Sequence, residues 1–138
     1  MRFYIASALD NVLAVRELAG ILVEDYGWVW AYDWTKHWSV PPESLQRTAE
    51  IAEEEIDGVY DADVIIGLLP GGRGTHMELG MGLVTEDCRV VVCGAPDSFY
   101  QDGRLCSFYT LAANIVIPSE WVNDVPWLAW EIVCRTRD

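Results

Sequence analysis

The chain has 138 residues, which is enough for one domain with a substantial core and too few for two. Hydrophobic residues make up 51% and charged residues 22%, a globular composition, and no segment reaches the roughly 20 apolar residues of a membrane span. The formal net charge is −13, from 22 acidic and nine basic residues, so the surface would repel the phosphates of polymeric nucleic acid and we expect no such partner.

The opening sequence, MRFYIASALDN, has the pattern of a strand and lacks the charge and cleavage layout of a signal peptide. We therefore expect a cytoplasmic protein that contacts no membrane. The four cysteines lack paired C-x-x-C spacing, and no second ligand lies at metal spacing from either histidine. We expect neither a metal nor another cofactor.

Short apolar runs alternate with amphipathic stretches along the chain, a pattern typical of a parallel sheet with helices on both faces. The predicted strands are residues 2–6, 28–32, 64–69, 89–93 and 114–117. The predicted helices are residues 12–26, 43–60, 75–85 and 119–135, the last with Pro126 as a point where it can split. Five such strands fit a flavodoxin-like, doubly wound α/β fold in a single domain over residues 1–138. The longest irregular stretch, residues 94–108, is either a lid or an oligomer contact.

The loops that follow the first two predicted strands are expected to contribute to a ligand site. A doubly wound sheet binds its ligand beyond the carboxyl ends of its strands. The first of these loops begins with Ser7, and the second holds Asp33. Asp33 suits a hydrogen bond to a sugar hydroxyl or a base amine, or equally a turn or a helix cap.

The second strand is rich in tryptophan. Trp28 and Trp30 share one face of the predicted strand and are interpreted as core. Trp34 and Trp38 fall past the strand end. These two suit stacking on a planar base or packing against a partner subunit.

The third loop belongs to the most informative stretch of the chain, ADVIIGLLPGGRGTHMELGMGL, residues 62–83. It joins a buried strand, a glycine-rich turn and the start of a helix at Thr75, an arrangement that makes a ready anion site. Backbone N–H groups of the turn can orient a sugar or a phosphate, and Arg73 can clamp a phosphate or a carboxylate. The binding residues expected from this turn are Gly71, Gly72, Arg73, Gly74 and Thr75.

Glu78 is the candidate catalytic residue of the same stretch. We place it in the first turn of the helix, at the edge where such a sheet binds its ligand. That position suits a nucleophile that the helix dipole keeps ionised. The alternative is structural, because Thr75 and Glu78 have the spacing of a capping box.

An acidic run in the second predicted helix offers a second carboxylate. By default such a run is a solvated helix face, but Glu55 can reach toward the crevice and complete an acid and nucleophile pair with Glu78. The members of the run are Glu53, Glu54, Glu55, Asp57 and Asp61.

At these residues the chain resembles the nucleoside 2-deoxyribosyltransferase family, which includes deoxynucleotide N-hydrolases. The resemblance is carried by FYIASALDN, by YDWT and by DADVIIGLLPGGRGTHMELGMGL, and it covers most of the chain. It implies a flavodoxin-like fold and cleavage of an N-glycosidic bond, with Glu78 as the nucleophile and Glu55 in place of a second acidic residue that is usually aspartate. Gly72 stands where the family often has aspartate or serine. The resemblance also implies a homo-oligomer whose sites are completed by a neighbouring subunit.

A second resemblance links PGGRGTHME to the PGGxGTxxE signature of the cytokinin-activating phosphoribohydrolases, although SALDN replaces the upstream glycine-rich turn of that family. Both resemblances imply cleavage of the same kind of bond, an N-glycosidic bond. We therefore expect an enzyme that hydrolyses or transfers at the N-glycosidic bond of a (deoxy)nucleoside or its monophosphate. A non-catalytic nucleotide-binding module and a flavin-binding redox protein are the rival classes. The sequence leaves open the base, the sugar, the need for a 5′-phosphate, and hydrolysis against transfer.

Overall fold

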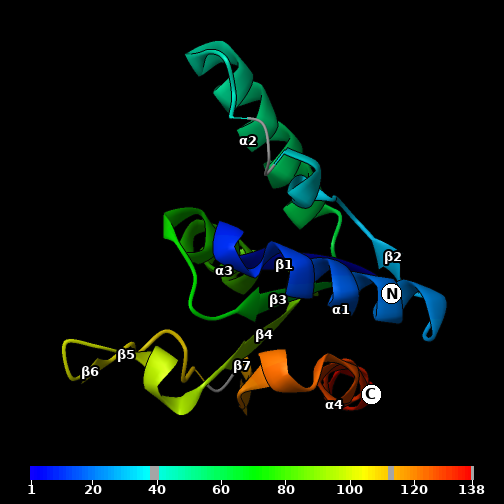
Figure 1. Ribbon diagram of the computed structural model, residues 1–138, viewed down its shortest axis with the longest axis vertical. Helices are drawn as coiled ribbons and strands as arrows, with labels where there is room; N and C mark the ends of the chain where they lie inside the picture. The colour runs from blue at the N-terminus through cyan, green and yellow to red at the C-terminus, as the bar shows by residue number, and fades with distance from the viewer. Residues whose placement is uncertain (38–40, 112–113, 138) are drawn as a thin grey trace.

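The computed structural model describes residues 1–37, 41–111 and 114–137 of the chain. Its centre is a five-stranded, all-parallel sheet in the order β2-β1-β3-β4-β7 (Figure 1). This order confirms the predicted flavodoxin-like, doubly wound α/β architecture. The strands are β1 (Arg2–Ser7), β2 (Val29–Trp30), β3 (Val64–Leu68), β4 (Arg89–Gly94) and β7 (Asn114–Pro118).

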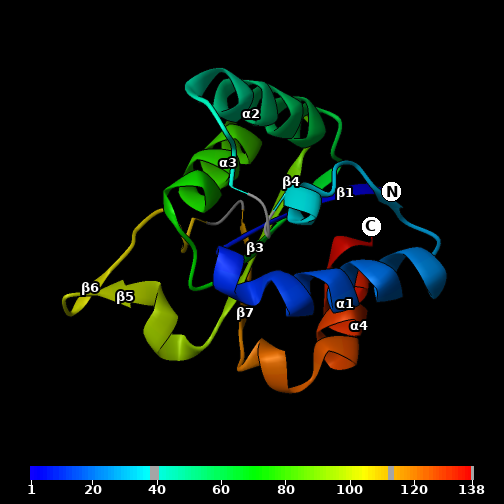
Figure 2. The same ribbon diagram turned by 45° about the horizontal axis from the view of Figure 1, so that its top comes forward.

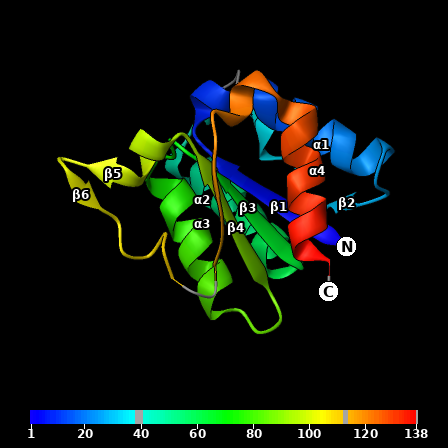
Figure 3. The ribbon, with the colours of Figure 1, turned by 90° about the horizontal axis from the view of Figure 1, so that it is seen from below.

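Helices cover both faces of the sheet. On one side α1 (Val12–Glu24) packs against α4 (Val125–Thr136), and on the other α2 (Leu45–Tyr60) lies with α3 (Arg73–Val84) (Figure 3). The three central strands are buried on both faces, so their sequences are continuous apolar runs instead of alternating ones. Burying each large apolar side chain stabilises the fold by about 1.5–3 kcal/mol.

Two glycines let α3 lie close to the sheet. A Cβ at Gly67 would lie 2.7 Å from a methyl carbon of Leu79, and one at Gly82 would lie 2.5 Å from Cδ1 of Ile65. Neither distance leaves room for a methyl group, so the close contact of α3 with β3 requires glycine at both positions. This contact sets the position of Glu78 over the sheet.

Helix α2 projects from the body of the protein (Figures 1 and 2). The hydroxyl of Ser44 caps its start by accepting the N–H of Arg47 at 3.1 Å. Only Gly58 and Val59 of this helix are fully buried, and Leu45 at its start is 90% exposed. The carboxyl-terminal half of α2 therefore holds the helix on the sheet and on α3, while the amino-terminal half extends beyond them.

The start of α3 differs from the prediction. The helix begins at Arg73, two residues early, with Gly72 as its N-cap residue. The hydroxyl of Thr75 accepts the N–H of Gly72 at 3.2 Å. The predicted place of Glu78 in the first turn is therefore wrong, and so is the structural alternative of a capping box with Thr75, because Glu78 is the sixth residue of the helix and its side chain bonds to another element.

Other element bounds are also corrected. Strand β2 is shorter than predicted, and α4 begins at Val125 after a short 3-10 turn over Trp121–Asn123. Pro126 lies in the first turn of α4 and starts the helix instead of splitting a longer one, because an N–H at that position has no intrahelical partner. Asp124 completes this start by accepting the N–H of Trp127 at 3.0 Å.

The stretch predicted to be irregular after β4 contains regular structure. A 3-10 turn over Pro96–Phe99 leads into a hairpin of β5 (Tyr100–Gln101) and β6 (Arg104–Leu105). The turn residues Asp102 and Gly103 have φ values of 51° and 73°, as a type I′ hairpin turn requires. Within the described ranges, none of the helices has both the length and the apolar character needed to cross a membrane.

Candidate active site

The centre of the site is a hydrogen bond between β1 and α3. The hydroxyl of Tyr4 donates to Oε1 of Glu78 at 2.7 Å. Tyr4 is completely buried and Glu78 is half-buried. The pKa of the Tyr4 hydroxyl is raised far above its usual value, mainly by burial and secondly by the charge of Glu78. Tyr4 therefore keeps its proton and acts as the donor.

Helix α2 is seated on two tyrosines beside this bond. A Cβ at Gly58 would lie 2.5 Å from Cβ of Tyr32 and 3.3 Å from Cδ2 of Tyr4, so only glycine allows the approach. Glu54 and Glu55 lie one turn before Gly58 on the same side of the helix and are half-buried. The other members of the acidic run, Glu53, Asp57 and Asp61, are exposed. The predicted solvated face is therefore correct for three members and wrong for Glu54 and Glu55.

Glu55 is close enough to the central bond to act on it electrostatically. Burial raises the pKa of Glu55, and the charge of Glu54 raises it further. The charge of Glu55 in turn raises the pKa of both Tyr4 and Glu78. The structure thus places the two predicted catalytic carboxyls, Glu55 and Glu78, within electrostatic reach of each other.

The ionisation of Glu78 differs from the expectation. Its pKa is raised to about 7, because burial and the charge of Glu55 together raise it by more than the bond from Tyr4 lowers it. The helix dipole does not hold this carboxyl ionised, since its influence fades beyond the first turn and Glu78 is the sixth residue of α3. Near neutral pH the protonated and ionised forms of Glu78 therefore coexist.

A second tyrosine and carboxylate pair lies next to the first. The hydroxyl of Tyr32 donates to Oε2 of Glu54 at 2.6 Å, so Nε2 of His37, at 3.1 Å from the same hydroxyl, is the donor in their contact. This bond is the main reason that the pKa of Glu54 is lowered. Arg47 lies 3.5 Å from Glu54, and the ammonium of Lys36 lies 4.6 Å from the centre of the Tyr32 ring.

The cationic side chains of Lys36 and Arg47 border an open pocket of about 370 Å³ between the 3-10 turn Trp34–His37 and the start of α2. Lys36, His37 and Arg47 line it together with Ile51 and the segment 41–44. A chain with only nine Lys and Arg residues therefore gathers two of them on one pocket.

The residues predicted at the end of β2 mostly serve the structure. Oδ1 of Asp33 accepts the N–H of Thr35 at 2.9 Å and also its hydroxyl, so Asp33 forms a turn. Trp34 is buried, and its Nε1 donates to the carbonyl of Ile5 at 2.6 Å. Its predicted stacking on a base is wrong because the ring belongs to the core. Trp38 lies outside the described residues.

The core interpretation is confirmed for Trp28, whereas Trp30 is partly buried and packs against the core. The ring centroids of Trp28 and Trp30 lie 6.1 and 6.2 Å from that of Phe3, and Trp30 is stacked on it with an interplanar angle of 6°. Both rings thus attach the short edge strand β2 to β1.

The glycine-rich turn and Ser7 meet at the carboxyl edge of the sheet, as predicted. The hydroxyl of Ser7 donates to the carbonyl of Leu68 at 2.9 Å and accepts from Nδ2 of Asn11 at 2.8 Å. Asn11 also reaches the carbonyl of Pro70 at 3.3 Å. Ser7 is therefore engaged in joining the ends of β1 and β3.

Within the turn, Gly71 packs so closely on Thr75 that a Cβ would lie 2.4 Å from Cγ2 of that side chain. Thr75 is buried, whereas Gly72, Arg73 and Gly74 are exposed. From Arg73 to Glu78 is about 8 Å along the helix axis. The turn and the carboxyl group are therefore neighbouring but separate parts of the site.

The sequence analysis did not identify Tyr4, Tyr32 or Gly58 as residues of the site. A tyrosine inside a buried strand needs a partner for its hydroxyl, and this requirement is the signal that could have identified Tyr4. In the described part of the chain, no three His, Cys, Asp or Glu side chains are grouped so that they could hold a metal ion. No protein-family model matches the chain, and no curated protein matches it.

Proposed function

We propose that this protein cleaves the N-glycosidic bond of a (deoxy)nucleoside or its 5′-monophosphate, with Glu78 as the nucleophile and Glu55 as the proton donor. The observation that carries the proposal is the half-buried carboxyl of Glu78, held by Tyr4 within the electrostatic reach of a second carboxyl, Glu55. Two carboxyl groups in unlike surroundings are the usual equipment for breaking a glycosidic bond. The resemblance in sequence supports the same assignment.

The hydrogen bond from Tyr4 suits Glu78 to attack. It occupies Oε1, and Oε2, which makes no hydrogen bond to any described residue, is the atom that we propose attacks the anomeric carbon. A hydroxyl that donates to a carboxylate favours its charged form. The proposed reactive state has the charge on Glu78, whose charged form the bond from Tyr4 favours, and the proton on Glu55, whose pKa is raised by burial.

The chemical step follows from that state. Oε2 of Glu78 forms a bond to the anomeric carbon while the bond from that carbon to the base nitrogen breaks, and the base takes the electron pair and the proton of Glu55. The products are free base and a glycosyl ester of Glu78. Water or a second base then attacks the ester, with Glu55 accepting the proton, which gives hydrolysis or transfer respectively.

The experiment is base release from a panel of ribo- and deoxyribonucleosides and their 5′-monophosphates, followed by chromatography. The proposal predicts release with at least one substrate, with no release by Glu78→Gln and normal release by the matched control Glu53→Gln. Glu53 is exposed on α2 and has no role in the site. Binding of a nucleotide without release of any base would instead indicate a non-catalytic binding module.

A further inference from the structure

Helix α2 carries Glu55 but is buried over only one of its turns. It is seated at Gly58, where a Cβ would lie 2.5 Å from Cβ of Tyr32 and 3.3 Å from Cδ2 of Tyr4. Gly58 and Val59 are its only fully buried residues, and its amino-terminal half projects from the body of the protein (Figures 1 and 2). A contact at one turn leaves a helix free to swing about that turn. A second point of attachment is therefore needed to fix the direction of α2.

The second point of attachment is a hydrogen bond one turn before Gly58. The hydroxyl of Tyr32 donates to Oε2 of Glu54 at 2.6 Å. Among the described residues, Glu54 is the only member of α2 whose side chain forms a hydrogen bond or ion pair with another element. Because Glu54 and Glu55 are consecutive on one helix, the bond that holds Glu54 also limits the movement of Glu55.

Tyr32 is itself held in place. Nε2 of His37 donates to the hydroxyl oxygen of Tyr32 at 3.1 Å, so this hydroxyl is engaged both as a donor and as an acceptor. Between these two residues the chain is anchored by Trp34, whose ring is buried in the core, and by Thr35, which is completely buried. The bond to α2 therefore starts from a part of the protein that is fixed to the core.

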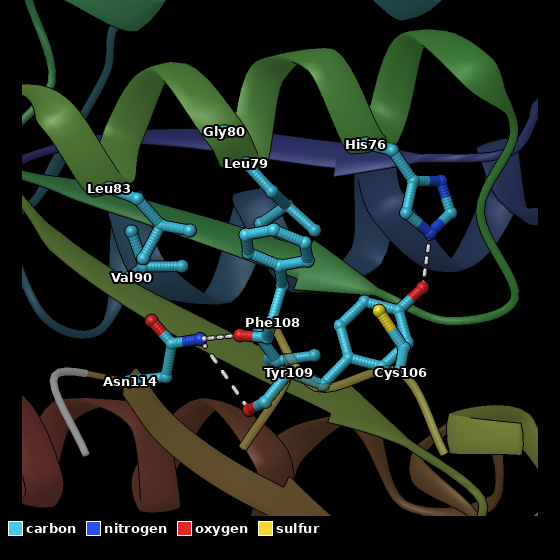
Figure 4. A pocket seen from close by; sticks show the side chains of 10 residues that line it. His76, Leu79, Gly80, Leu83, Val90, Cys106, Phe108, Tyr109 and Asn114 are labelled. Atoms are coloured by element: carbon cyan, nitrogen blue, oxygen red, sulfur yellow. Dashed lines mark hydrogen bonds between the residues drawn. The ribbon is translucent and has the colours of Figure 1, made fainter. Parts of the chain in front are cut away.

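The helix that carries Glu78 is held by contacts that do not involve α2. Nδ1 of His76 lies 2.7 Å from the carbonyl of Gly72 and therefore carries its hydrogen, so Nε2 accepts the hydroxyl of Tyr109 (Figure 4). This bond ties α3 to the segment that follows the hairpin of β5 and β6, and α3 also packs closely on β3. Of the two carboxyls, it is thus Glu55 whose position depends on the attachment of α2.

The free half of α2 makes the attachment at Glu54 important. It extends from Glu53 to Leu45, about 12 Å along the helix axis, and Leu45 is 90% exposed. Any swing of this half is transmitted to Glu55 unless the helix is fixed at a second turn. A misplacement of about 1 Å can reduce the rate of a reaction about 100-fold.

We propose that Tyr32 and Glu54 are positioning residues, whose hydrogen bond fixes the direction of α2 and so keeps Glu55 within electrostatic reach of Glu78. Neither residue needs to touch a substrate in this role. The consequence for catalysis rests on the proposed function, but the effect on the two carboxyls does not.

A different role for Glu54 would be to act through its charge, which raises the pKa of Glu55. Glu54→Gln separates the two roles, because it removes the charge and keeps an oxygen that accepts the hydroxyl of Tyr32. Glu54→Ala removes both the charge and the acceptor. Tyr32→Phe removes the donor and keeps the ring that packs on Gly58.

The test measures how strongly Glu55 acts on Glu78, by NMR titration of the Glu78 carboxyl in the full chain. Glu55→Gln should lower the pKa of Glu78, because it removes a neighbouring charge. In the Tyr32→Phe and Glu54→Ala backgrounds this decrease should shrink to about half or less, because the two carboxyls are farther apart. Glu54→Gln should keep most of the decrease. Tyr60→Phe is the matched control, since Tyr60 lies on α2 and is 71% exposed, and it should keep all of it.

Base release gives a second readout. Tyr32→Phe and Glu54→Ala should lower kcat for ordinary nucleosides about tenfold with little change in KM, because the proton donor is displaced. An analogue whose leaving group needs no proton should be cleaved at nearly the wild-type rate.

Two results of the titrations would overturn the proposal. An undiminished effect of Glu55→Gln in Tyr32→Phe and Glu54→Ala would show that the bond does not place Glu55. An equal loss in Glu54→Gln and Glu54→Ala would show that Glu54 acts through its charge. Glu54 is partly exposed, so Glu54→Ala decides the matter even where Tyr32→Phe does not fold. Absence of base release from every substrate would contradict the proposed function and leave the titrations to decide the positioning role.

Discussion

The hydroxyl of Tyr4 donates to Oε1 of Glu78 at 2.7 Å and so connects the centre of β1 with the second turn of α3. The bond lowers the pKa of Glu78, but burial outweighs it, and the resulting pKa is about 7. The negative charge of Glu55, like burial, raises the pKa of Glu78. The state of Glu78 near neutral pH is therefore set by one hydrogen bond and one neighbouring carboxyl.

Tyr4→Phe is expected to raise the pKa of Glu78, because it removes the group that favours the carboxylate. The nucleophile is the ionised form of Glu78 and the acid is the protonated form of Glu55, so base release should pass through a maximum with pH, and this maximum should be lower and lie at a higher pH in the variant. At pH 7 the variant should turn over about tenfold more slowly. The measurements are the NMR titration of the Glu78 carboxyl and the pH profile of base release. An unshifted titration in the variant would show that the bond has no influence.

Glu55→Gln is expected to act in the opposite direction on the same titration. Removing the neighbouring charge should lower the pKa of Glu78. Base release from ordinary nucleosides should fall by about 100-fold, because the leaving base loses its proton donor. A nucleoside analogue whose leaving group needs no protonation should be cleaved at nearly the wild-type rate. Equal loss with both kinds of substrate would argue against Glu55 as the acid.

The sheet order was predictable from the sequence because the strands are continuous apolar runs, such as VIIGL in β3, separated by helices of adequate length. The approach of Glu55 to Glu78 was expected both from its reach along the helix and from the resemblance. The bond from Tyr4 to Glu78 was not foreseen, since residues 74 positions apart meet only through the packing of α3 on β1.

Two errors in the sequence-based predictions have different physical causes. Trp34 lies beyond the end of β2, a position that indicates a loop, yet the chain turns back and inserts the ring into the core. Glu78 was assigned to the first turn of α3 because Thr75 has the residue type of an N-cap, but Gly72 occupies that position. Tertiary packing overrides the local preference only at Trp34; at α3 the helix simply begins two residues earlier, and Thr75 caps it as the third helical residue.

The stability of the protein should depend on pH through Glu78. Its folded pKa is about 7 and its reference value is 4.5, so the folded state binds more protons between these values and stability falls as pH rises from 4.5 to 7. Glu78→Gln should remove this pH dependence. The free energy of unfolding of the variant minus that of the wild type should therefore be about 2–3 kcal/mol more favourable at pH 8 than at pH 4. Urea denaturation of both proteins at the two pH values measures the difference. A difference that does not change with pH would contradict the raised pKa.

Gly58→Ala should destabilise the fold although alanine favours a helix. The new methyl group would lie 2.5 Å from Cβ of Tyr32, so α2 would have to move away from both tyrosines. We expect a net loss of about 1–3 kcal/mol in the free energy of unfolding. Gly20→Ala in α1 is the matched control, because its Cβ would meet no atom within 4 Å. That control should gain about 1 kcal/mol, and equal effects at the two positions would show that α2 is not seated as described.

Trapping the glycosyl ester on Glu78 tests the central claim most directly. A 2-fluoro-substituted nucleoside slows the breakdown of such an ester, so that mass spectrometry of proteolytic fragments can locate it on the chain. The account predicts a sugar adduct on the fragment that contains Glu78, with release of one base per chain and no adduct in Glu78→Gln. Base release that continues in Glu78→Gln, with no adduct on this residue in the wild type, would contradict it.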